Sequence, residues 1–103
     1  MDIRDGLAKS LLPDFETALS QVPSMLNSFD ESTDDALLVD TQSAETLALS
    51  RLVFGSIEET LRYLRKPSKR LAGKTPLDCI KAGGAERDEV ITDLIRLIEG
   101  YVF

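Results

Sequence analysis

The sequence predicts an all-α fold of about five to six short helices in one compact domain. Apolar residues recur every three or four positions along most of the chain, which is the period of an amphipathic helix. Prolines, glycines and capping residues divide the periodic stretches into short units. The 103 residues, of which 43% are apolar and 29% are charged, suit a single globular domain with a modest core.

The first part of the chain is expected to form helices interrupted by prolines. Residues 2–12 place their apolar side chains on one face of a short helix that Pro13 ends. Residues 14–29 show helical spacing again, and Pro23 is expected to kink this helix or to restart it. Residues 30–40 are rich in Asp and form the expected linker, in which the apolar run Ala36-Leu37-Leu38-Val39 either begins a helix or forms a short extended piece.

From Thr41 onward the start and stop signals are sharper. A helix from Thr41 to Phe54 is expected to end at Gly55, whose lack of a side chain suits a left-handed cap. Ser56 and Glu59 have the spacing of a capping box. The helix that they open is closed by a proline, because the residue before proline disfavours helical geometry.

Two further helices complete the expected fold. Thr75 followed by Pro76 is a strong start signal, because a hydroxyl cap precedes a proline whose missing N–H costs nothing there. This helix is expected to stop at Gly83 and Gly84, where glycines permit a tight turn. The last helix runs from about residue 85 to residue 99, and Gly100 is its expected cap.

Several classes of enzyme lack the residues that they need. There is no histidine, no tryptophan and a single cysteine, Cys79. Histidine acid–base chemistry, Ser-His and Cys-His nucleophiles and zinc sites of the Cys/His type are therefore not available. The sequence predicts a protein that is not an enzyme, with no catalytic residue, metal or cofactor. Cys79 lies in a short apolar helix and is expected to be buried and inert.

The hydropathy pattern predicts a cytoplasmic protein without a membrane segment. The longest uncharged apolar runs hold three or four residues, whereas a membrane span needs about 20. The first residues show no basic start followed by an apolar stretch, so no signal peptide is expected.

Charge is distributed unevenly between the two halves. Residues 1–50 contain ten acidic and two basic residues, whereas residues 51–103 contain ten basic and eight acidic ones, and the whole chain has a net charge of −6. A run of six bases without an acid, here named the basic stripe, consists of Arg62, Arg65, Lys66, Lys69, Arg70 and Lys74. Such a stripe can meet phosphate, an acidic partner or only water. An overall acidic chain without a recognisable reading helix disfavours nucleic acid.

The residues after the last helix are unusually apolar. Tyr101, Val102 and Phe103 follow Gly100 directly, although chain ends are normally polar. Two interpretations remain open at this point. The three side chains cover the chain's own core, or they insert into a partner.

The second half resembles the toxin-binding domain of Xre/MbcA/ParS-type antitoxins, from about Ala44 to Phe103. The resemblance rests on the order and spacing of three patterns and of the residues that follow them. These are Leu52-Val53-Phe54-Gly55-Ser56 with Glu59, Tyr63-Leu64 with Pro67, Leu71 and Gly73, Thr75-Pro76-Leu77-Asp78, and then Gly84, Val90, Leu94, Ile98, Glu99 and Gly100. Tyr63 stands where the family usually has tryptophan, so an aromatic ring is retained.

The resemblance implies an antitoxin of a type II toxin–antitoxin system. Such antitoxins neutralise RES-domain toxins, which resemble ADP-ribosyltransferases and consume NAD or use it to modify a target. The end of the antitoxin blocks the NAD pocket of the toxin. Carried over to this chain, the toxin-binding residues are Glu99, Gly100, Tyr101, Val102 and Phe103. The basic stripe is a further candidate for flanking toxin contacts, which is an inference from charge and not a family motif.

The resemblance divides the chain into an acidic helical segment of unassigned role, residues 1–43, and a toxin-binding domain, residues 44–103. Many family members have an N-terminal helix-turn-helix that binds DNA, but residues 1–43 show no compact turn leading to a basic recognition helix. The alternative function is a DNA-binding transcriptional regulator that uses the basic stripe at residues 62–74. Whether the chain forms a homodimer stays open.

Overall fold

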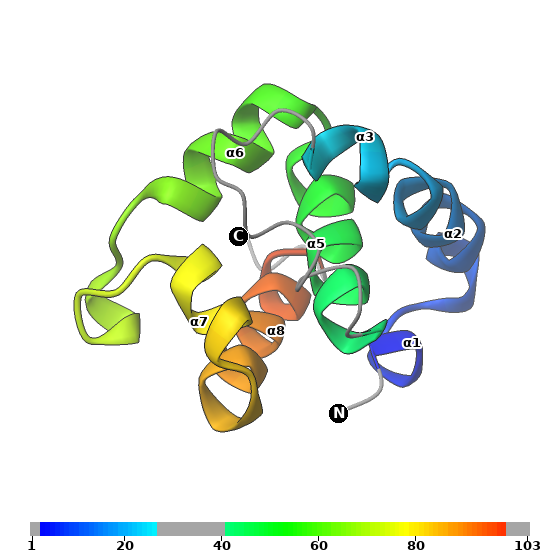
Figure 1. The fold of residues 1–103 in the computed structure, drawn as a ribbon. Helices are drawn as coiled ribbons and strands as arrows, with labels where there is room; N and C mark the ends of the chain where they lie inside the picture. The colour runs from blue at the N-terminus through cyan, green and yellow to red at the C-terminus, as the bar shows by residue number, and fades with distance from the viewer. Residues whose placement is uncertain (1–2, 27–40, 99–103) are drawn as a thin grey trace.

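The computed structural model describes residues 3–26 and 41–98, and these residues are helical nearly throughout (Figure 1). The all-α prediction is confirmed for them, because no strand occurs in the described ranges. They form seven α-helices and two 3-10 turns, slightly more helices than the expected five to six. The elements are α1 (Ile3–Gly6), η1 (Lys9–Leu11), α2 (Leu12–Ser20), α3 (Val22–Leu26), α5 (Thr41–Phe54), α6 (Ile57–Arg65), η2 (Lys69–Leu71), α7 (Pro76–Ala82) and α8 (Gly84–Ile98).

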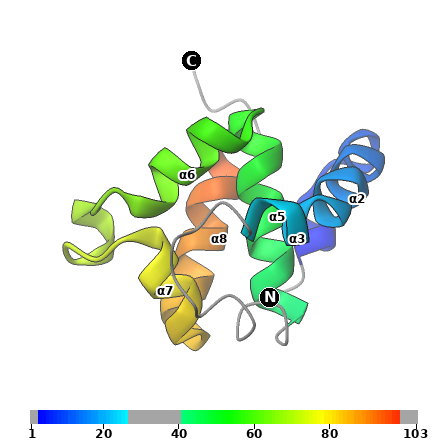
Figure 2. The same cartoon turned by 45° about the horizontal axis from the view of Figure 1, so that its top comes forward.

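Helix α5 is the central element of the fold. Helix α2 packs against one side of it, while α6 and α8 pack against it elsewhere, and α7 packs on α8. Figures 1 and 2 show α2 on one side of α5 and the group of α6, α7 and α8 on the other. The early and late parts of the chain therefore meet through α5.

One continuous apolar core joins these helices. Phe15 of α2, Leu47 and Leu49 of α5 and Leu94 of α8 are completely buried and belong to the same cluster. Cys79 also lies in this cluster with 2% of its surface exposed, so the expectation that it is buried is confirmed. Burying these side chains is the main favourable contribution to folding.

The first part of the chain differs from the prediction of one helix over residues 2–12. Helix α1 ends at Gly6, and η1 follows before α2 begins at Leu12. Pro13 therefore lies in the first turn of a helix and does not end one. This placement is favourable because proline needs no hydrogen-bond partner for its nitrogen there. This division adds the 3-10 turn η1 between the first two helices.

Pro23 behaves as one of the two expected alternatives. A turn at Gln21 separates α2 from α3, and α3 begins at Val22, so the helix restarts at the proline. Residues 27–29 of the predicted helix and the expected linker at residues 30–40 lie outside the described residues.

The predicted boundaries in the second half are largely confirmed. Gly55 has a φ of +80° directly after α5, which is the left-handed geometry that glycine adopts without strain. The Ser56 hydroxyl accepts a hydrogen bond from the Glu59 backbone N–H at 3.2 Å. The Glu59 carboxylate instead accepts one from Arg62 at 2.8 Å. The Thr75 hydroxyl caps α7 by accepting from the Asp78 N–H at 3.1 Å.

Two arginines connect distant segments. Arg4 forms ion pairs with Glu16 of α2 and with Glu45 of α5, and it lies over the ring of Phe15. Arg87 of α8 donates hydrogen bonds to the side chains of Gln42 and Ser43 at the start of α5, at 2.7 Å and 3.2 Å. No helix in the described ranges is long and apolar enough to cross a membrane.

Candidate functional site

A groove runs between η2 and the exposed side of α8. It consists of two adjoining cavities of about 370 Å³ and 260 Å³, which share Arg70, Asp93 and Arg96. We call this feature the η2–α8 groove. Its full lining is Tyr63, Ser68, Arg70, Leu71, Asp88, Glu89, Thr92, Asp93, Arg96 and Leu97.

The wall formed by η2 is held by a tight turn. The Ser68 hydroxyl accepts a hydrogen bond from the Arg70 N–H at 3.3 Å, and the Ser68 N–H donates to the Lys74 carbonyl at 3.0 Å. Ala72 and Gly73 both have positive φ, at 58° and 83°, which reverses the chain after η2. Leu71 is buried below the groove. Its burial holds Arg70 at the surface opposite α8.

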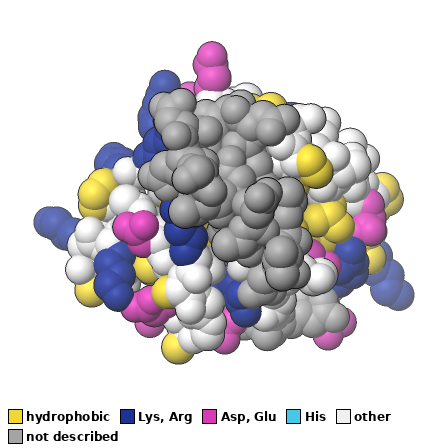
Figure 3. Space-filling model, in the orientation of Figure 1, with side chains coloured by type: hydrophobic (Ala, Val, Ile, Leu, Met, Phe, Trp, Pro, Cys, Tyr) yellow, Lys and Arg dark blue, Asp and Glu magenta, His cyan; other side chains and the backbone are white. Residues whose placement is uncertain are grey.

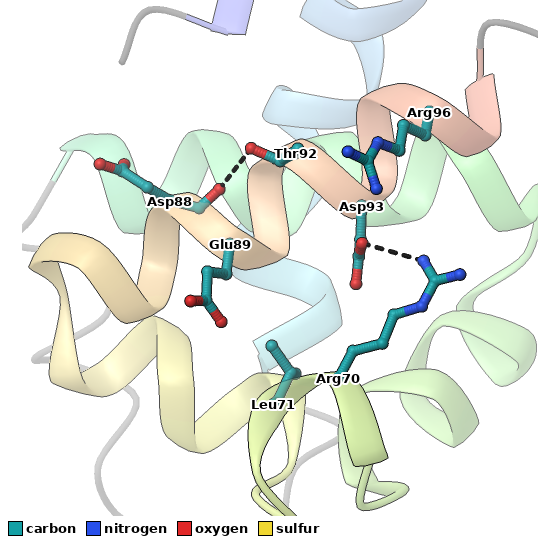
Figure 4. Close-up of a pocket in the computed structure, with 7 residues that line it drawn as sticks. All are labelled: Arg70, Leu71, Asp88, Glu89, Thr92, Asp93 and Arg96. Carbon is teal, nitrogen blue, oxygen red and sulfur yellow. Dashed lines mark hydrogen bonds and ion pairs between the residues drawn. The ribbon is translucent and has the colours of Figure 1, made fainter.

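Charge within the groove is only partly balanced. Arg70 donates a hydrogen bond to Asp93 at 3.1 Å and thereby bridges η2 and α8. Figure 4 shows Asp93 lying between Arg70 and Arg96. Arg96 is exposed and makes no ion pair with a described residue. One cation of the groove is therefore available to an outside carboxylate.

Tyr63 of α6 lines one end of the groove, and its ring packs against that of Phe54. The rings of Phe54 and Tyr63 lie 4.7 Å apart with their planes tilted by 33°, which is within the range of favourable aromatic contacts. Burial raises the pKa of the Tyr63 hydroxyl well above its usual value, and the negative charge of Asp93 raises it further. Tyr63 is thus a neutral, rigid wall of the groove at physiological pH.

The structure divides the basic stripe into paired and unpaired members. Arg62 forms an ion pair with Glu59, Arg70 with Asp93 and Lys74 with Glu86. Lys66 and Lys69 are exposed and form no ion pair within the described residues. In Figure 3, basic side chains on the side of α6 and α7 are mixed with acidic ones. The stripe is therefore not a uniform field of positive charge.

The predicted toxin-binding residues at the end of the chain have no described geometry. Glu99, Gly100, Tyr101, Val102 and Phe103 lie outside the described residues, and so does the expected cap at Gly100. Helix α8 is described up to Ile98 and packs on α5 and α7. It provides the packed base from which these five residues continue.

Some residues of the groove were not singled out from the sequence. Asp93 and Arg96 are ordinary charges on a helix, and only the approach of η2 shows that they line a cavity. Leu97 recurs at helical spacing with the apolar residues of α8, so periodicity alone assigns it to the buried face. No local sequence pattern marks these residues as part of a groove. The only indirect signal is the turn from Ser68 to Lys74, which brings η2 to α8.

Cysteine and acidic groups in the described part do not form a reactive centre. Burial raises the pKa of the Cys79 thiol, which keeps the thiol protonated and weakly nucleophilic. Among the described residues, no group of three or more His, Cys, Asp and Glu side chains is arranged to hold a metal ion. The groove can therefore bind a partner through apolar contacts and through charge.

These features define a small helical domain whose charged and aromatic groups are gathered along a surface groove. Residues 50–98 match the family model of the antitoxin Xre/MbcA/ParS C-terminal toxin-binding domain. The match extends from the last turn of α5 to the end of α8, and the resemblance to this antitoxin domain is confirmed over these residues. Neither the curated proteins nor the solved structures include a match to the chain.

Proposed function

We propose that this chain is the antitoxin of a type II toxin–antitoxin system and neutralises a RES-domain toxin. In this proposal it binds the toxin and blocks its NAD pocket with residues 99–103, and it performs no catalysis of its own. The observation that carries the proposal is the family match over residues 50–98. The match ends one residue before the segment that would block the pocket.

The chemistry of that segment supports the mechanism. Tyr101, Val102 and Phe103 are three large apolar residues in succession, and two aromatic rings supply a large contact area at low entropic cost. Occupancy of the pocket by such side chains excludes NAD without any chemical step. Helix α8 packs on α5 and α7, so the segment starts from a fixed base and less freedom is lost on binding.

Unpaired members of the basic stripe are secondary candidates for toxin contacts. Lys66 and Lys69 form no ion pair with a described residue, whereas Arg62, Arg70 and Lys74 are paired with acids. The same pairing weakens the alternative of a DNA-binding regulator, because at least three of the six positive charges pair with acids of the described residues. Phosphate contacts depend on many unpaired cations.

The test compares the chain with a variant that has an altered segment. NAD consumption by the proposed partner, a purified cognate RES-domain toxin, is measured against increasing antitoxin. The triple variant Tyr101→Ser, Val102→Ser and Phe103→Ser is expected to leave most of the toxin activity at saturating concentration. Parent inhibition is expected to weaken as NAD concentration rises, because both compete for one pocket.

A thermal melt of the same variant supplies the control. An unchanged melting temperature with inhibition lost supports the blocking role. A clear fall in melting temperature with inhibition preserved would instead mean that the three side chains cover the chain's own core. A parent chain that does not reduce NAD consumption at all would contradict the proposed function.

A further inference from the structure

The apolar face of α8 extends further than the core that covers it. Leu97 follows Val90 by seven residues, which is two helical turns, so both lie on the same face. Val90 and Leu94 are completely buried, whereas Leu97 is 47% exposed and is the only large hydrophobic residue exposed to this degree in the described part of the chain. The last turn of α8 therefore presents an uncovered apolar side chain.

Leu97 lies beside the unpaired cation of the groove. Arg96 and Leu97 line the same cavity, together with Tyr63, Ser68, Arg70 and Asp93. Since Asp93 already binds Arg70 at 3.1 Å, the cavity combines a neutral aromatic wall, an apolar side chain and one cation without an ion-pair partner among the described residues. This combination fits a partner surface with an apolar side chain next to a carboxylate.

The reach of the chain identifies the partner. A fully extended residue spans at most about 3.6 Å, so Leu97 lies no more than about 14 Å from Tyr101 along the chain. A toxin that takes Tyr101 into its pocket must therefore bring its surface close to the last turn of α8. The groove adjoins this turn directly.

Interface size requires contacts beyond the blocking segment. A stable complex buries about 800 Å² on each partner and uses about 20–30 residues a side. Residues 99–103 are five residues, so they provide only part of that surface. The nearest described surface with unsatisfied apolar and charged groups is the end of the groove formed by Tyr63, Arg96 and Leu97.

From these observations we propose that the Leu97 end of the η2–α8 groove is a second docking site for the toxin. The occupant is a surface segment of the RES-domain toxin beside its NAD pocket, with an apolar side chain against Leu97 and Tyr63 and a carboxylate that pairs with Arg96. This inference rests on the proposed function. In this proposal the groove contributes to the affinity for the toxin, whereas residues 99–103 block its NAD pocket.

The division of roles gives the two sites different experimental signatures. The double variant Arg96→Glu and Leu97→Lys is expected to raise the Kd for the cognate RES-domain toxin by about tenfold or more, because central contacts dominate binding. At saturating concentration it still inhibits completely, since residues 99–103 are intact. The variant of residues 101–103 shows the opposite: it binds the toxin but leaves most of its activity.

A matched control is available at η1. Lys9 and Ser10 are adjacent and exposed, so Lys9→Glu and Ser10→Lys reproduce the two charge changes outside the groove. This control is expected to bind within twofold of the parent. Both altered groove side chains are exposed, and the melting temperature of each variant is compared with that of the parent.

Hydrogen exchange of the unaltered complex provides a test without substitution. Amides of η2 and of the last two turns of α8 are expected to exchange more slowly when the toxin is bound. A groove variant with a Kd within twofold of the parent, or a complex without added protection at η2, would overturn the second docking site. A parent chain that does not bind the RES-domain protein would instead count against the proposed function itself.

Discussion

The N-terminal segment (residues 3–26) and the matched segment (residues 50–98) are both helical, but different forces determine their helices. In the matched segment, α6, η2 and α7 begin with side-chain caps at Ser56, Ser68 and Thr75. In the N-terminal segment, η1 and α2 begin at Ala8 and Leu11 without a side-chain cap. Helices in the matched segment are therefore specified by local sequence, and those in the N-terminal segment depend more on tertiary contact.

Contacts with α5 stabilise the helices of residues 3–26, which lack side-chain caps at η1 and α2. Phe15 and Ile3 are completely buried in the shared core, and Arg4 pairs with Glu45 of α5. Gly6 lies so close to α8 that an added Cβ would come within 2.7 Å of the end of the Ile95 side chain. Short helices are marginal alone and gain most of their stability from packing. In residues 3–26, helix formation is therefore coupled to packing against the rest of the domain.

The strongest test of this coupling is Phe15→Ala. Removing a fully buried phenylalanine is expected to lower the free energy of unfolding by about 3–5 kcal/mol. Urea denaturation is expected to show one transition at lower urea, because Phe15 belongs to the same core as Leu47 and Leu94. Two transitions, with the matched segment unaffected, would show that the segments fold independently.

A smaller effect is expected from removing a cap. Thr75→Ala deletes the acceptor of the hydrogen bond from Asp78 and is expected to cost about 1 kcal/mol in urea denaturation. The control is Ser10→Ala in the N-terminal segment, where the hydroxyl is exposed and caps no helix. That change is expected to stay within about 0.5 kcal/mol. Equal losses at both positions would remove the difference between the segments.

Prediction from sequence succeeded where a helix boundary depends on neighbouring residues. Gly55, Ser56 and Thr75 have the backbone angles or capping bonds that their residue types predict. Prediction failed at Pro13, because proline is compatible with the end of one helix and with the first turn of the next. Packing of α2 on α5 decides between these alternatives.

The candidate site was less predictable than the fold. The basic stripe was visible as a run of charges, but its pairing with Glu59, Glu86 and Asp93 depends on side chains from other turns and from α8. The exposure of Leu97 depends on where the core ends, and periodicity alone assigns it to the buried face. The η2–α8 groove forms because η2 and α8, which are distant in the sequence, pack side by side. A local sequence pattern does not reveal this contact.

Among the residues that the structure describes, burial favours the neutral form of two titratable groups, and both are in the matched segment. Burial raises the pKa values of the Tyr63 hydroxyl and the Cys79 thiol, while residues 3–26 contain neither tyrosine nor cysteine. In the unfolded chain these groups ionise near pH 10 and pH 8.5. Their contribution to stability is fully present below those values and is lost as pH rises toward the higher folded pKa values.

Alkaline pH is therefore expected to destabilise the protein, because groups in the matched segment ionise on unfolding. Of the stability changes predicted here, this one is expected to be the smallest. The comparison is between the parent and Tyr63→Phe, which retains the ring contact with Phe54 but has no ionisable hydroxyl. Between pH 9 and pH 10.5 the parent melting temperature is expected to fall a few °C more than that of the variant, which corresponds to less than about 1 kcal/mol. Lysine deprotonation affects both proteins equally and cancels in the difference. Parallel melting curves across this range would show that Tyr63 ionises as readily in the folded protein as in the unfolded chain.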